Sequence, residues 1–143
     1  MYVEVTVRIA APPSTVWDVL VDVERWPTWT ASTRSATVVG GGALAVGSVV
    51  RIKQPGLPVA DWTVTELDPG RSFTWETEST GMASQGVHEI SATDDGTSEV
   101  RLVFEQVGSM AMVVGLVFGR KARRYVQMEA DGLKARSEAG PAS

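Results

Sequence analysis

The sequence predicts an α+β fold in which one antiparallel sheet of seven strands packs against a single long helix near the C-terminus. Two observations carry this prediction. Apolar and polar residues alternate through most of residues 2–107, and only short turns separate the alternating segments. After Gly108 the apolar residues recur at helical spacing. Parallel strands would need crossover connections of about a dozen residues or more, so the short turns favour antiparallel pairing.

The chain is expected to open with a strand and two short helices. Valine or isoleucine occupies every second position from Val3 to Ile9, which predicts a strand over residues 2–10. Pro12 and Pro13 cannot extend a strand but are tolerated in the first turn of a helix. Apolar residues at helical spacing then predict a short helix, and a second helical turn is expected around residues 24–28.

Six further strands are expected to follow in direct succession. Each ends at a turn rich in glycine, proline or aspartate, the residues that favour tight reversals of the chain. The expected strands are residues 33–39, 48–54, 59–67, 71–79, 85–93 and 98–107.

A long helix is expected from Met110 to about Lys134, and its apolar stripe must cover one face of the sheet. With no repeat or linker in the chain, residues 1–136 are expected to form a single domain. Residues 137–143 are expected to form a flexible tail. The expected stripe consists of Met110, Val114, Phe118, Ala122, Tyr125 and Met128.

Composition excludes several classes of function. The chain has a net charge of −4 and lacks the excess of basic residues that binding to a phosphate backbone requires, so no nucleic-acid partner is expected. The absence of cysteine excludes disulfides and thiolate chemistry. With one histidine and carboxylates at mostly outward positions, no metal and no cofactor are expected. The Gly40–Gly42 run lacks the residues of a phosphate-binding loop.

Location and assembly are less constrained. The N-terminal residues do not resemble a signal peptide, so a cytoplasmic protein is expected. The longest apolar run, residues 110–118, is far shorter than the roughly 20 residues that span a bilayer, so no stable membrane insertion is expected. Both a monomer and a homodimer remain open.

Side-chain parity predicts one face of the sheet that mixes aromatic and branched residues with a few polar ones, including Gln54, Thr77, His88 and Gln106. Such a mixture is typical of a ligand pocket, although a sheet and a helix can also close on each other without a cavity. The expected ligand-binding residues are Ile52, Gln54, Trp62, Val64, Phe73, Trp75, His88, Ile90, Leu102, Phe104, Val114, Phe118 and Tyr125.

Several segments together form a pattern found in a known superfamily. They are Val16-Trp17-Asp18-Val19-Leu20, Arg25-Trp26-Pro27-Thr28-Trp29, residues 53–58 leading to residues 62–67, and His88-Glu89-Ile90 before Asp94-Asp95-Gly96-Thr97. Over residues 3–136 the chain resembles the polyketide cyclase/dehydrase-like branch of the START/Bet v 1-like (SRPBCC) superfamily. The resemblance implies the helix-grip fold: a curved seven-stranded antiparallel sheet wrapped around the C-terminal helix, two short helices at one end, and a cavity between sheet and helix. It does not fix the activity, because the superfamily includes lipid carriers, hormone receptors and cyclases.

Two main functions are weighed, beside a third and weaker one, a domain that modulates a partner protein, which a large exposed apolar patch would favour. The first is binding of a hydrophobic or aromatic small molecule, polyketide- or lipid-like, without a cofactor. The alternative is an enzyme of the polyketide cyclase/dehydratase type in which His88 is the catalytic residue for proton transfer and Tyr125 and Gln54 polarise carbonyl groups. Against the second, a buried histidine is more commonly satisfied by a neighbouring side chain.

A cationic cluster, Arg120, Lys121, Arg123 and Arg124, lies beside the apolar stripe of the long helix. It can hold an anionic ligand group or face an anionic membrane, but a solvated helix face paired with acidic neighbours is the simpler expectation. Trp26 and Trp29, on either side of Pro27, are expected to act as packing anchors for the short helices.

Overall fold

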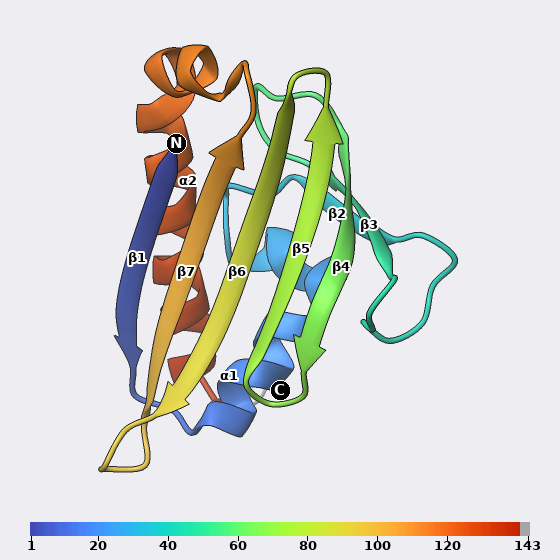
Figure 1. Ribbon diagram of the computed structural model, residues 1–143. Helices are drawn as coiled ribbons and strands as arrows, with labels where there is room; N and C mark the ends of the chain where they lie inside the picture. Colours follow the sequence, from blue (N-terminus) through green and yellow to red (C-terminus); the bar gives the residue numbers. More distant parts are fainter. Residues whose placement is uncertain (141–143) are drawn as a thin grey trace.

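A single antiparallel sheet of seven strands dominates the computed structural model, which describes residues 1–140 (Figure 1). The strand order is β1-β7-β6-β5-β4-β3-β2, so every neighbouring pair except β1 and β7 is consecutive in the chain. The predicted number of strands and their antiparallel pairing are confirmed. The strands are β1 (Tyr2–Ile9), β2 (Ser35–Val38), β3 (Val49–Lys53), β4 (Ala60–Asp68), β5 (Ser72–Ser79), β6 (Met82–Ala92) and β7 (Ser98–Val107).

The largest difference from the expected strand bounds is at the start of β6. This strand begins at Met82 rather than Gln85, because Met82 pairs directly with Ser79 of β5. A two-residue connection closes the hairpin, and Gly81 takes a φ of +74°, a conformation that glycine adopts without steric cost. The hairpin therefore extends the sheet beyond the point where sequence alternation stops.

Three helices accompany the sheet within residues 1–140. The two short ones are α1 (Pro13–Val21) and η1 (Val23–Thr28), and they follow β1 as predicted. The long one, α2 (Ala111–Glu138), leaves the end of β7 and runs behind β1 and β7 (Figure 1). No helix in the described part of the chain is long and apolar enough to cross a membrane.

The end of α2 corrects the expected tail. The helix continues to Glu138, and the Ser137 side chain is buried, so the flexible tail does not begin at residue 137. The last turn is held because the Glu138 carboxylate accepts hydrogen bonds from the backbone N–H of Ala10 at 2.7 Å and from Lys134 Nζ at 2.6 Å. Residues 141–143 of the expected tail lie outside the described residues.

The concave face of the sheet packs on α2, with α1 and η1 closing one end, and this is the helix-grip arrangement expected from the resemblance. Apolar side chains from both layers form one continuous core. Its largest fully buried members include Ile9, Leu20, Phe73, Leu102 and Leu133.

Trp26 of η1 and Trp29, which directly follows η1, pack against each other. Trp26 also lines the pocket between the sheet and α2, so it is more than the packing anchor that was expected. Trp26 is buried, and its indole N–H donates a hydrogen bond to the Leu20 carbonyl at 2.9 Å. Its ring lies 5.4 Å from that of Trp29. The backbone of Trp29 approaches α2 so closely that a Cβ atom on Gly132 would lie 2.0 Å from the Trp29 carbonyl oxygen. Glycine at this position is what allows η1 to sit against α2.

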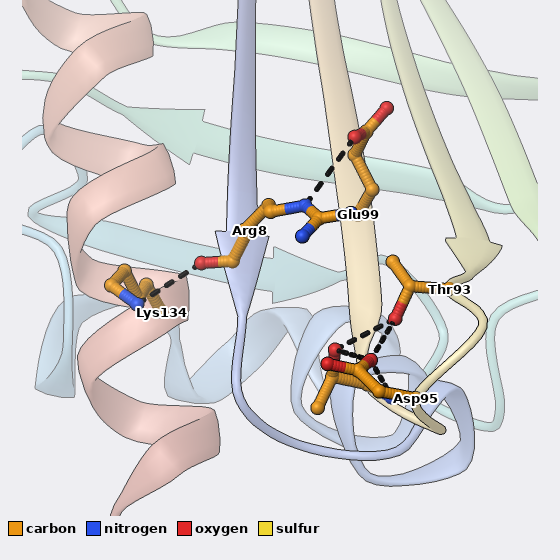
Figure 2. Close-up of polar contacts among 6 residues, drawn as sticks. Arg8, Thr93, Asp95, Glu99 and Lys134 are labelled. Carbon is orange, nitrogen blue, oxygen red and sulfur yellow. Dashed lines mark hydrogen bonds and ion pairs between the residues drawn. The ribbon is translucent and has the colours of Figure 1, made fainter.

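Polar contacts join the exposed ends of β1, β7 and α2 (Figure 2). Lys134 Nζ donates to the Arg8 carbonyl at 3.0 Å, and Arg8 Nε lies 4.0 Å from a carboxylate oxygen of Glu99. In the turn between β6 and β7, the hydroxyls of Thr93 and Thr97 both donate to Asp95 Oδ1. These bonds stabilise the carboxylate and lower the pKa of Asp95 to about 2.

Candidate functional site

A pocket of about 830 Å³ lies between the concave face of the sheet and residues 114–129 of α2. Its walls come from β3 to β7, the loop between β3 and β4, α2, Trp26 of η1 and residues 32–33. Pockets that hold drug-sized ligands measure about 300–1,000 Å³, so this volume suits a molecule of several fused rings or a folded acyl chain.

Ten of the thirteen residues expected to contact a ligand line this pocket. They are Ile52, Gln54, Trp62, Trp75, His88, Leu102, Phe104, Val114, Phe118 and Tyr125.

Three of the residues expected to contact a ligand do not line the pocket. Val64, Phe73 and Ile90 are buried on the inward face, as parity requires, but they belong to the packed core. The Phe73 ring stacks on His88 at 4.1 Å on one side and meets the edge of Trp17 at 6.4 Å on the other. Parity assigns a side chain to a face but not to a depth along the strand. At Phe73 the space is filled by Trp17 of α1.

An aromatic wall forms the inner side of the pocket. The ring of Trp75 lies 5.9 Å from that of Trp62 and 5.3 Å from that of Trp26, and all three residues line the cavity. Gly86 makes this possible, since a Cβ atom there would lie 2.7 Å from Trp75 Nε1. The absence of a side chain on β6 lets the indole of the neighbouring strand β5 lie across it.

His88 is the buried polar group of this wall, with 4% of its surface exposed. Its Nδ1 atom lies 3.1 Å from the Phe73 carbonyl oxygen. Because a carbonyl oxygen only accepts hydrogen bonds, Nδ1 carries the proton, and Nε2 is directed at α2, where it lies 3.4 Å from Glu129 Oε1. The imidazole is thus fixed in orientation from both sides.

Glu129 is a pocket residue that the sequence analysis missed. Its carboxylate lines the cavity, and Oε1 is buried without a hydrogen-bond partner among the described residues. The signal that could have found it is helical spacing, because Glu129 lies four residues after Tyr125, an expected lining position. A hydrophobic pattern on α2 does not identify Glu129, because its side chain is charged.

Gln106 supplies a second unpartnered oxygen. The residue is 9% exposed and lines the pocket, its Nε2 donates to Ser84 Oγ at 3.2 Å, and its Oε1 has no partner among the described residues. Buried polar atoms are nearly always hydrogen-bonded in native structures. Gln106 and Glu129 therefore each place an unpartnered acceptor oxygen at the pocket. A hydrogen-bond donor on a bound ligand would satisfy them.

Tyr125 joins α2 to the loop between β3 and β4. Its hydroxyl donates to the Pro55 carbonyl at 2.6 Å, so the phenolic hydrogen is already engaged. Lys121 reaches across the same loop, since a Cβ atom on Gly56 would meet its ammonium group, and its Nζ lies 5.6 Å from the centre of the Tyr125 ring. Gln54, on the facing side, lines the cavity at the start of this loop.

The cationic cluster of α2 lacks the acidic partners that were expected. Among the described residues, no carboxylate lies within ion-pair distance of Arg120, Lys121, Arg123 or Arg124. The reason is local sequence, because no acidic residue occurs between Ala111 and Met128. The expectation of a salt-bridged helix face is therefore corrected.

Comparison with known proteins agrees with the fold. The chain belongs to the family described as polyketide cyclase/dehydrase and lipid transport, which matches residues 2–138. Family and fold together are those of hydrophobic-ligand-binding or polyketide cyclase-type proteins. A search of curated protein sequences gave no match.

Solved structures show the same fold at low sequence identity. A START superfamily protein from Mycobacterium smegmatis is 16% identical, with a TM-score of 0.77 over 96% of this chain and 97% of that one. Ara h 8.0201 is 12% identical, with a TM-score of 0.76 over 98% and 99%. The di-domain ARO/CYC protein StfQ, from the steffimycin biosynthetic pathway, is 18% identical, with a TM-score of 0.69 over 95% of this chain and 44% of that one.

Proposed function

We propose that this protein binds a hydrophobic or aromatic small molecule, polyketide- or lipid-like, in the pocket between the sheet and α2. The observation that carries the proposal is the combination of a cavity of about 830 Å³ with a wall that includes Trp62 and Trp75. Burying apolar ligand surface against such a wall supplies affinity at roughly 25 cal/mol per Å². Polar atoms at a few positions then set the orientation of the ligand.

The unpartnered oxygens of Gln106 and Glu129 favour a ligand with hydroxyl groups. Each oxygen accepts a hydrogen bond, and a ligand donor would remove the cost of leaving it unpaired, about 1–3 kcal/mol per buried group. Phenols and hydroxylated polycyclic compounds combine such donors with the flat apolar surface that the tryptophan wall fits.

Calorimetric titration with 2-naphthol and with 2-methoxynaphthalene tests this proposal. The two probes share a ring system, but only the naphthol can donate a hydrogen bond, so it should bind roughly tenfold more tightly. Equal affinity would contradict the role of the two oxygens, and the absence of saturable binding by these probes and by a long-chain fatty acid would contradict ligand binding itself.

A matched pair of variants locates the site. Ala122 lines the pocket from α2, whereas Ala135 lies on the exposed face of the same helix. Ala122→Phe places a ring in the cavity and should weaken binding roughly tenfold or more, while Ala135→Phe should leave it unchanged. Equal effects of the two changes would place binding elsewhere on the molecule.

A second candidate function is turnover of a poly-ketone chain by a cyclase or dehydratase reaction. It is favoured by the placement of His88 in the pocket wall beside the Glu129 carboxylate, a histidine and an acidic partner within 3.4 Å. A general base typically contributes ~10²-fold or more to the rate. If His88→Ala keeps turnover of such a substrate within a few-fold of wild type, this role is excluded.

A further inference from the structure

We propose that the first half of α2 is a docking surface for the face of a lipid bilayer that contains anionic lipids. Four apolar side chains, Met112, Val113, Leu116 and Val117, project from this segment into solvent. Leu116 is 84% exposed and Met112 is 78% exposed. We call these four residues the α2 apolar face.

The exposure of this face is unusual for a surface helix. Single exposed apolar residues are ordinary, but neighbouring ones on adjacent turns form a patch, and such patches mark sites of interaction. The residues cannot turn inward, because the opposite side of the same turns is occupied: Val114 and Phe118 line the pocket, and Gly115 faces Met1. The α2 apolar face is therefore excluded from the domain's own core.

The charge of the next two turns identifies the kind of partner. Arg123 lies seven residues after Leu116, and Arg124 seven after Val117, so each shares a helix face with the apolar residue before it. Arg120 lies between them on the same face. A helix face that begins apolar and continues cationic fits the boundary between acyl chains and anionic headgroups.

The cationic residues are available for such a contact. Among the described residues no carboxylate pairs with any of them, and the segment from Ala111 to Met128 contains basic but no acidic residues. This local excess occurs in a chain whose net charge is −4. Four of the 13 basic residues of the chain thus lie within five consecutive positions, in a segment that has no acidic residue.

A second copy of the chain fits the face less well than a bilayer does. A symmetric dimer would have to pair the surface with itself, and this surface offers no carboxylate to meet the partner's Arg120, Arg123 and Arg124. Like charges brought together in an interface oppose association. Anionic headgroups supply the missing negative charge.

Docking by this face would place the pocket at the membrane. Val114, Phe118 and Lys121 line the pocket on the same turns of α2, and Pro58 and Val59 of the facing loop line it from the other side. Val59 is itself exposed, so the apolar surface continues across the rim. This consequence, exchange of a ligand between bilayer and pocket, rests on the proposed function, whereas docking itself does not.

The test is sedimentation of the full chain with vesicles of phosphatidylcholine alone and of phosphatidylcholine mixed with phosphatidylglycerol. We expect binding to the mixed vesicles that falls steeply with added salt, and weak binding to the neutral ones. Binding to neither, or equal binding to both, would overturn the proposal.

Variants make the assignment specific. Leu116→Glu should lower vesicle binding about tenfold or more, because it removes a leucine that enters the bilayer on docking and adds a negative charge. Val46→Glu, at another exposed apolar position, is the matched control and should change nothing. The double change Arg120→Gln and Arg123→Gln should lower binding to mixed vesicles, and Arg71→Gln, at the distant β4–β5 turn, should not. Equal effects in either pair would overturn the proposal.

Two further readouts separate this proposal from its competitors. Leu116 does not line the pocket, so Leu116→Glu should still bind 2-naphthol as wild type does if the proposed function holds. Ala122→Phe should bind vesicles normally whether or not the pocket takes a ligand. A stable dimer in analytical ultracentrifugation that Leu116→Glu dissociates, without vesicle binding, would assign the face to a second copy and overturn the proposal.

Discussion

His88 Nε2 on β6 lies 3.4 Å from Glu129 Oε1 on α2, and this contact joins the two layers of the fold at the pocket wall. The Nδ1–H group donates to the Phe73 carbonyl at 3.1 Å, so Nε2 is the ring nitrogen that faces the carboxylate. Glu129 Oε1 has no hydrogen-bond partner among the described residues, and a donor group placed at the pocket wall would satisfy it. The pair therefore brings a strand, a helix and the pocket together at one point.

The role of this pair predicts opposite outcomes for two substitutions. Glu129→Gln replaces the carboxylate with an amide that can donate to Nε2, so the free energy of unfolding should stay within about 1 kcal/mol of wild type. Glu129→Leu leaves Nε2 facing an apolar side chain, so this variant should be less stable than the glutamine variant by about 1–3 kcal/mol. Urea unfolding followed by tryptophan fluorescence measures both values, and a leucine variant as stable as the glutamine variant would contradict the assignment.

The close approach of η1 to α2 predicts that alanine at position 132 is harmful even though alanine favours helices. A Cβ atom there would lie 2.0 Å from the Trp29 carbonyl oxygen, so Gly132→Ala must push the elements apart and should destabilise the fold by about 2 kcal/mol or more. Gly119→Ala is the control, because its Cβ would meet only Met1 Sδ at 3.7 Å. That change should stabilise the protein by about 0.5–1 kcal/mol. Thermal unfolding measures the stability of both variants, and a Gly132→Ala protein as stable as wild type would contradict the close approach.

The β6–β7 turn predicts a stability effect at acidic pH. Hydrogen bonds from Thr93 and Thr97 hold the pKa of Asp95 at about 2, below its value in the unfolded chain, which is about 3.9. A lowered pKa in the folded state stabilises the fold above the unfolded value, and this contribution disappears as the pH falls from about 4 to about 2.

Comparison with Asp95→Asn measures this effect, because asparagine does not titrate. The stability advantage of wild type over the variant should be constant above about pH 5 and should shrink as the pH falls from about 4 to about 2. Circular dichroism during urea unfolding at several pH values follows the difference. A difference that stays the same at pH 5 and pH 2 would show that the carboxylate is not held by the two threonines.

Much of the fold could be predicted from local patterns. Alternation in segments such as residues 98–107 identifies both a strand and its inward face, and the change of period after Gly108 locates α2. These patterns are strong because the spacing of the buried residues recurs along the whole length of a strand or helix. The start of β6 at Met82 could not be found in the same way, because pairing across a tight turn does not require alternation.

The pocket could be predicted only in part, because its limits depend on how the layers meet. Parity placed Phe73 and Trp75 on one face, but only the structure shows that α1 covers Phe73 while Trp75 stays at the cavity. Gly86 and Glu129 were missed for a similar reason. One matters through the side chain it lacks and the other is a charged residue on an apolar stripe, so neither belongs to a hydrophobic pattern.

The most direct test of ligand binding is the response of the tryptophan indole N–H signals to 2-naphthol in proton–nitrogen correlation spectra. Trp62 and Trp75 line the pocket, whereas Trp17 packs against Phe73 outside it and serves as an internal control. Binding in the pocket predicts saturable shifts of the Trp62 and Trp75 signals while the Trp17 signal stays in place. Saturation with shifts confined to Trp17, or no saturable shift at any indole, would contradict it.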